Sequence, residues 1–224
     1  MMSSRRNVSW SYLALITCLI ASVGDLVSLV VFADFYPAYN SYSQPISALG
    51  ASGSPIAREV SLWWIFLGLI FLTFAFAYRM SNDTNNPVLR ITSWLIAAYA
   101  VGEEIGSGMF PGNHLAGHLT AMGIIHNIVG GIGIVALALI PFVLMKYYTR
   151  AIHPAFNRFL LTISMTGIFF FLLFSISRFS LPELQWFRSW HGLWQRLFVA
   201  NYYIMLVVIA VKQVMESRAI HTGG

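Results

Sequence analysis

The sequence predicts an all-α integral membrane protein, a bundle of six transmembrane helices with both termini in the cytoplasm. Hydrophobic residues make up 58% of the 224 positions and charged residues only 9%, whereas about a quarter of the residues in soluble domains are charged. The apolar residues are gathered in runs long enough to cross a bilayer, which takes roughly 20 residues. Because every backbone N–H and C=O in lipid must be bonded within the protein, such runs form helices.

Six apolar runs follow one another along the chain. The first begins after Arg5 and Arg6 and is longer than the apolar core of a signal peptide, which has about 7–15 residues, so we interpret it as a span. The third run is interrupted by two adjacent carboxylates, Glu103 and Glu104. We expect residues 1–224 to form a single polytopic membrane domain. The predicted spans are residues 10–35, 60–78, 89–107, 119–144, 159–176 and 193–211.

Positively charged residues predict the orientation of these spans, since cytoplasmic loops are enriched in Lys and Arg. With both termini in the cytoplasm, nine such residues lie inside and four lie outside or at outer helix ends. The inner residues are Arg5, Arg6, Arg79, Arg90, Lys146, Arg150, Arg158, Lys212 and Arg218, and the outer ones are Arg58, Arg178, Arg188 and Arg196. The net charge of +5 therefore follows the topology and does not indicate nucleic-acid binding. We expect a multi-pass protein of the cell membrane.

The segment from Val101 to His126 carries two carboxylates and three histidines between two apolar runs. A further acid, Asp25, lies near the middle of the first span in a polar stripe with Ser22 and Ser28. A carboxylate at bilayer depth costs roughly 2.5–3.5 kcal/mol and usually faces polar partners or water inside the bundle. The sequence therefore predicts that Asp25 meets polar groups from other helices.

These partners define the leading hypothesis, an outward-facing polar pocket that binds a lipid head group or another amphiphile at outer-leaflet depth. Adjacent helix positions point about 100° apart, so we expect only one glutamate to face the pocket fully, and the small neighbours of Glu104 favour it. His118 is expected near the mouth. Glycines in the fourth span allow close helix packing and predict a central place for it. The expected lining residues are Asp25, Ser47, Glu103 or Glu104, His126, Arg178, Arg196 and Asn201.

Two histidine-based cofactor sites remain open alternatives. If Asn113 caps a helix that starts at His114, then His114 and His118 lie one turn apart on one face. With Glu104 they would supply three zinc ligands and leave one position open. The sequence lacks the H-E-x-x-H motif, because Leu115 holds the position of its base. A haem bound by two histidines would need His126 and His191 to face each other.

The same residues leave two other functions open beside amphiphile binding. One is a metal-assisted hydrolase or transferase that acts on a lipid-linked substrate through the zinc ligands. The other is a small proton-coupled transporter in which Asp25 titrates. Transport needs a path to the cytoplasm, whereas the inner halves of most predicted spans are nearly free of polar residues.

Three short motifs resemble a known family. The segment Ser43–Gly50 fits the pattern S-x-x-I-S-x-L-G, and Gly108–Pro111 and His126 also fit that family's pattern. The family is domain of unknown function 998, small prokaryotic multi-pass membrane proteins, many of which carry an acid at the position of Ala48. The resemblance implies a helical membrane fold and a bacterial or archaeal origin, and it implies no established activity.

Overall fold

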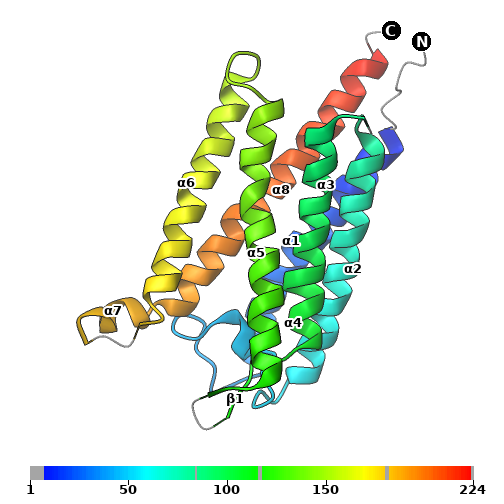
Figure 1. Ribbon diagram of the computed structural model, residues 1–224. Helices are drawn as coiled ribbons and strands as arrows, with labels where there is room; N and C mark the ends of the chain where they lie inside the picture. The colour runs from blue at the N-terminus through cyan, green and yellow to red at the C-terminus, as the bar shows by residue number, and fades with distance from the viewer. Residues whose placement is uncertain (1–7, 84, 116–117, 180–181, 223–224) are drawn as a thin grey trace.

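The computed structural model describes residues 8–83, 85–115, 118–179 and 182–222, which form a bundle of long helices with both ends of the chain on one side (Figure 1). Five helices in the described part of the chain are long and apolar enough to cross a membrane. They are α1 (Val8–Asp34), α2 (Ala57–Ser81), α5 (Ala121–Tyr147), α6 (Pro154–Ile176) and α8 (His191–Thr222). The chain is therefore a multi-pass membrane protein.

The third apolar run forms three consecutive helical pieces. These are α3 (Pro87–Tyr99), the π-helical segment η2 (Ala100–Ile105) and α4 (Gly106–Met109), and α4 continues the column of α3 in Figure 1. Asn86 caps the start, because its side chain accepts hydrogen bonds from the backbone N–H groups of Val88 and Leu89. Pro87 follows at the first helical position, where a missing N–H costs nothing.

The short elements gather at the end of the bundle opposite the termini, which we call the loop end; the other we call the terminal end (Figure 1). They are η1 (Ile46–Ala48), β1 (His114–Leu115), β2 (His118–Leu119), η3 (Pro182–Leu184) and α7 (Gln185–Arg188).

The predicted helix start at His114 is wrong. His114 pairs with Leu119, and Leu115 with His118, in an antiparallel hairpin. Helix α5 begins only at Ala121, because the Thr120 hydroxyl accepts a hydrogen bond from Gly123 N at 3.1 Å and caps that end.

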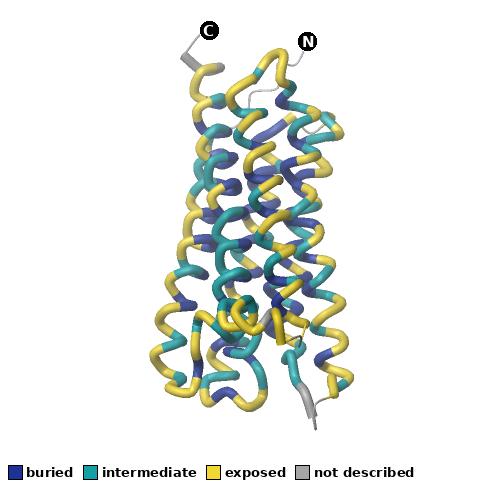
Figure 2. The backbone as a smooth tube through the Cα atoms, turned by 90° about the vertical axis from the view of Figure 1, so that its left-hand side faces the viewer, coloured by how far each residue is buried: buried dark blue, intermediate teal, exposed yellow. Residues whose placement is uncertain are grey.

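The last helix, rather than the fourth predicted span, lies deepest in the bundle. In the most apolar stretch of α8, 56% of the residues are buried, against 39% in α5. Helix α1 presents to the interior its stripe of small and polar residues, which includes Cys18, Ser22 and Asp25. The outer faces carry exposed residues (Figure 2), many of them large and apolar, such as Val30 and Trp94. An apolar exterior of this kind suits contact with lipid.

Glycines let the η2 backbone lie directly against its neighbours. A Cβ atom added to Gly102 would lie 2.5 Å from the carbonyl oxygen of Val129 in α5, and one added to Gly133 would lie 2.5 Å from the backbone nitrogen of Glu103. On the other side, a Cβ on Gly68 of α2 would lie 3.0 Å from the carbonyl oxygen of Ala100. The glutamate-bearing turn is thus held between α2 and α5 with no space for side chains between the backbones.

This close approach predicts that Gly133→Ala destabilises the protein, since the added methyl group would displace the η2 backbone. Overpacking of this kind costs about 1–3 kcal/mol, and we expect a fall of several degrees in the thermal unfolding midpoint in mild detergent. Gly131→Ala is the matched control, because a Cβ there meets no atom within 4 Å. Equal midpoints for the two variants would contradict the backbone contact.

Candidate functional site

The π-helical turn η2 brings both glutamates to the interior of the bundle. In a π-helix the hydrogen bonds join residues five apart, and Tyr99 and Glu104, five apart, lie side by side: the Tyr99 hydroxyl donates to Glu104 Oε1 at 2.8 Å. Glu104 is buried and Glu103 is half-buried, and both line the same cavity. Glu104, the glutamate that the sequence favours, is the more buried of the two, and Glu103 lines the cavity beside it.

Tyr203 of α8 connects the acids of α1 and η2. Its hydroxyl lies 2.9 Å from Asp25 Oδ2, 3.0 Å from Glu104 Oε1 and 2.6 Å from the Tyr99 hydroxyl. The two phenolic hydrogens are shared among these three contacts and the Tyr99–Glu104 contact. Phe71 of α2 packs against both tyrosine rings, with centroids 5.3 and 5.6 Å away.

A small cavity, which we call the deep cavity, lies beside this network. Its volume is about 30 Å³, the share of a single water molecule in the liquid. Asp25 Oδ1 is buried without a hydrogen-bond partner among the described residues, and Asp25 lines the cavity together with Glu103, Glu104 and Ser107. The deep cavity is therefore polar and acidic.

A second space, the middle cavity, has a volume of about 220 Å³ and lies between α5 and α6. Glu103 and Arg178 both line it, and they form no ion pair with each other. Its apolar wall includes Ile134, Val135 and Phe171. The middle cavity thus combines both signs of charge with hydrocarbon.

The third space, the vestibule, is a basin of about 1130 Å³ at the loop end. Arg178, Arg188, His126 and His191 lie among its lining residues, which include no Asp or Glu. Most of the other lining side chains are small or polar, with Leu119 as an exception, and they come from the loop after α1, the segment before α5 and the segment around α7. Charge therefore changes from basic in the vestibule to acidic in the deep cavity.

Ser47 lines all three cavities and so marks the point where they meet. It belongs to η1, whose position depends on α8: the backbone N–H of Ile46 donates to Gln195 Oε1 at 2.8 Å. Arg196 donates to the carbonyl oxygens of Gln44 and Gly192 at 3.3 and 2.9 Å. The loop after α1 is thus fixed as a cover over the bundle.

Two histidines of the vestibule have defined tautomers. The Nδ1 of His126 lies 2.8 Å from the carbonyl oxygen of Phe110, which can only accept, so Nδ1 carries the hydrogen. The Ser177 hydroxyl donates to the carbonyl oxygen of Phe174, so it accepts from His191 Nδ1 at 2.6 Å. Both rings therefore keep Nε2 for other partners.

Several expected residues lie elsewhere. Arg196 lines none of the three cavities, because its guanidinium is bonded to the loop after α1, including a 2.5 Å hydrogen bond to the Tyr39 hydroxyl. That hydroxyl is largely buried, and the loss of hydration raises the pKa of Tyr39. Asn201 also lines none of the three, since its amide binds Thr166 Oγ1 at 2.6 Å and the Ile163 carbonyl at 3.0 Å in α6.

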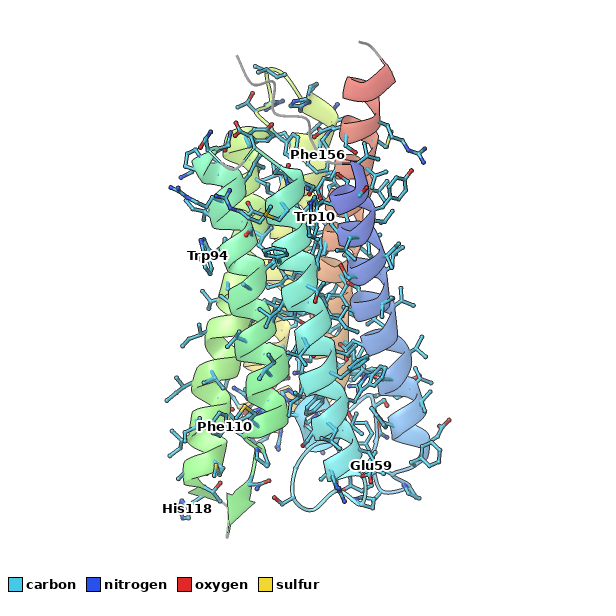
Figure 3. The ribbon with its side chains drawn as sticks, turned by 90° about the vertical axis from the view of Figure 1, so that its right-hand side faces the viewer. Trp10, Glu59, Trp94, Phe110, His118 and Phe156 are labelled. Carbon is cyan, nitrogen blue, oxygen red and sulfur yellow. The ribbon has the colours of Figure 1, made fainter. Side chains whose placement is uncertain are left out.

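The proposed zinc ligands do not come together in the part of the chain that is described. His118 is exposed at the far tip of the loop end (Figure 3), whereas Glu104 is buried among tyrosines. The side chain of His114 lies outside the described residues. Among the described side chains no three His, Cys, Asp or Glu residues form a group that could hold a metal ion.

Tyr99, Tyr203 and Gln195 contribute to the site although the sequence did not predict a place in it for them. Tyrosines in membrane helices are enriched at the two interfaces, and Tyr203 lies well inside its span instead, which is a usable signal for a buried polar contact. Gln195 gave no such signal, because it lies near the start of α8, where a polar side chain reaches water easily.

The family described as protein of unknown function (DUF998) matches residues 10–212. No curated protein and no solved structure matches the chain.

The shared hydroxyl predicts that Tyr203→Phe destabilises the protein, because Asp25 and Glu104 both lose a hydrogen-bond partner. A buried polar group left without its partner costs about 1–3 kcal/mol, which should lower the thermal unfolding midpoint in mild detergent. Tyr202→Phe is the control: the Tyr202 hydroxyl is buried and has no hydrogen-bond partner among the described residues. The network would be unimportant for folding if Tyr203→Phe were as stable as Tyr202→Phe.

Proposed function

The chain belongs to the DUF998 family of proteins of unknown function, and we propose, from the geometry of its cavities, that it binds an amphiphile whose head group includes an anionic group. The head group would occupy the vestibule and the middle cavity, and the hydrocarbon tail would leave between α5 and α6 into the bilayer. This proposal refines the pocket hypothesis drawn from the sequence.

The membrane topology that goes with this proposal has six spans and a cytoplasmic terminal end in the cell membrane. The column from Pro87 to Met109 rises roughly 33 Å at about 1.5 Å per residue, enough for the hydrocarbon core of about 30 Å. Arg79 and Lys146 lie in the last turns of α2 and α5 at the terminal end. The vestibule would then open to the outer side, with the middle cavity at outer-leaflet depth.

The observation that carries the proposal is that the middle cavity is polar inside and lipid-facing at its edge. Val135 and Phe171 line it, yet they are 54% and 40% exposed on the outer surface of the bundle. Helices α5 and α6 diverge from their connecting turn towards the loop end (Figure 1). A molecule can therefore place a polar group in the cavity while its tail stays in the bilayer.

The positive charge of the vestibule favours a head group with a negative charge. Arg178 lies over the Phe174 ring, 5.3 Å from its centroid, and its guanidinium has no hydrogen-bonding or ionic partner among the described residues. A guanidinium binds carboxylate or phosphate oxygens in pairs. With Arg188 nearby and no acid in the vestibule lining, an anionic group is the complementary ligand.

This arrangement predicts that Arg178→Gln weakens binding of a fluorescent short-chain phosphatidylglycerol by about 10-fold or more, the loss expected for one charge-assisted hydrogen bond. Equilibrium binding to the purified protein in mild detergent measures it. Arg90→Gln makes the same charge change at the terminal end, on the exposed face of α3, and should bind as the native protein does. Equal losses in both variants would indicate a nonspecific charge effect.

The lateral opening makes a second prediction. Gly131 lines the middle cavity, and a side chain added there meets no atom within 4 Å, so Gly131→Leu should fill the cavity without disturbing the fold. We expect at least a roughly 10-fold loss of affinity for the same lipid with an unchanged unfolding midpoint. The control is Ile132→Leu, at a lipid-facing position. Normal binding by Gly131→Leu would contradict occupation of this cavity.

A further inference from the structure

The middle cavity carries an unpaired carboxylate as well as an unpaired guanidinium. We propose that the head group bound there is a zwitterion, with an ammonium group at Glu103 and a phosphate group at Arg178. This inference rests on the proposed function, and it adds the chemical class of the head group. The vestibule alone, which is basic, would not distinguish a zwitterion from a simple anion.

Glu103 is directed into the cavity from η2. A Cβ atom on Gly130 would lie 2.7 Å from Glu103 Oε2, so the carboxylate reaches across the glycine face of α5, and Gly130 and Gly131 line the same cavity. Among the described residues Glu103 has no hydrogen-bond or ion-pair partner, in contrast to Glu104, which contacts both tyrosines. Glu103 is thus the acid of the cluster left for an external partner.

A charge without a partner at bilayer depth is costly, and such residues usually pair with a ligand or with each other. Glu103, from η2, and Arg178, which is exposed just beyond the end of α6, line the same cavity, and they form no salt bridge. A ligand that carries only an anionic group would pair with Arg178 and leave Glu103 without a partner. The Glu103 carboxylate would also repel the anionic group. A ligand with both signs satisfies both residues.

The size of the cavity agrees with such a group. A volume of about 220 Å³ is the share of roughly seven water molecules in the liquid, which accommodates a phosphate joined to a short amine. The wider vestibule, continuous with it at Ser47, His126 and Arg178, leaves room on the phosphate side. The phosphate–ammonium pair could belong to a membrane phospholipid or to a free phosphoamine.

The test compares the purified protein in mild detergent with two short-chain lipids of equal tail length, phosphatidylethanolamine and phosphatidylglycerol. We expect the ethanolamine lipid to bind at least about tenfold more tightly to the native protein. In Glu103→Gln, which keeps the shape and removes the charge, that preference should disappear. Glu59→Gln removes an exposed carboxylate of α2 at the loop end (Figure 3) and should keep the preference.

The outcomes separate the two proposals. Equal affinity of the native protein for both lipids, unchanged by Glu103→Gln, would overturn the zwitterion and leave amphiphile binding standing. If neither lipid binds, both proposals fall. Free phosphoethanolamine distinguishes the source: competition at similar concentrations supports a soluble zwitterion, whereas competition by the lipid alone supports a membrane phospholipid. Because the native protein is compared with two ligands, the test holds even if the Glu103 variant does not fold.

Discussion

The Tyr203 hydroxyl, shared by Asp25 and Glu104, is the contact on which the arrangement of the bundle depends. In hydrocarbon no water replaces a lost partner, so α1, η2 and α8 must stay in the register that keeps these oxygen atoms together. Phe71 fixes the two tyrosine rings from α2. The glycines of α2 and α5 then hold η2 at the depth where its glutamates reach the cavities. The polar interior is thus built by five elements that contact one another closely, α1, α2, η2, α5 and α8.

Much of the fold could be predicted from the sequence, because long apolar runs can only be helices in lipid. All six predicted spans lie within helical columns to within a few residues, and the polar stripe of α1 faces inward as expected from the position of Asp25. A break between helices was expected at residues 108–118, and the structure has one there. It contains a hairpin instead of the helix start expected at His114. The hairpin β1–β2 has only two residues per strand, which is too few to show the alternation of apolar and polar residues that predicts a strand.

The site was harder to predict, for two physical reasons. The π-helical turn shifts every later side chain relative to a regular helix, and no residue type marks it, so the orientation of Glu103 and Glu104 could not be obtained by counting turns. Side chains at helix ends can also reach several alternative hydrogen-bond partners, so the sequence does not predict which one they bind. Arg196 was expected to line the pocket, yet the backbone carbonyl oxygens of Gln44 and Gly192 accept hydrogen bonds from its guanidinium and hold it at the loop.

The cover over the cavities ties the beginning of the chain to its end. Ile46 and Gln44 are held by Gln195 and Arg196, roughly 150 positions later in the sequence. During synthesis, which proceeds from the N-terminus, the loop after α1 therefore lacks these hydrogen-bond partners until α8 has been inserted. The loop can be fixed over the cavities only at that final step. A chain stalled before α8 would lack Tyr203 as well as Gln195 and Arg196, so neither the acids of α1 and η2 nor the loop after α1 would yet be held in place.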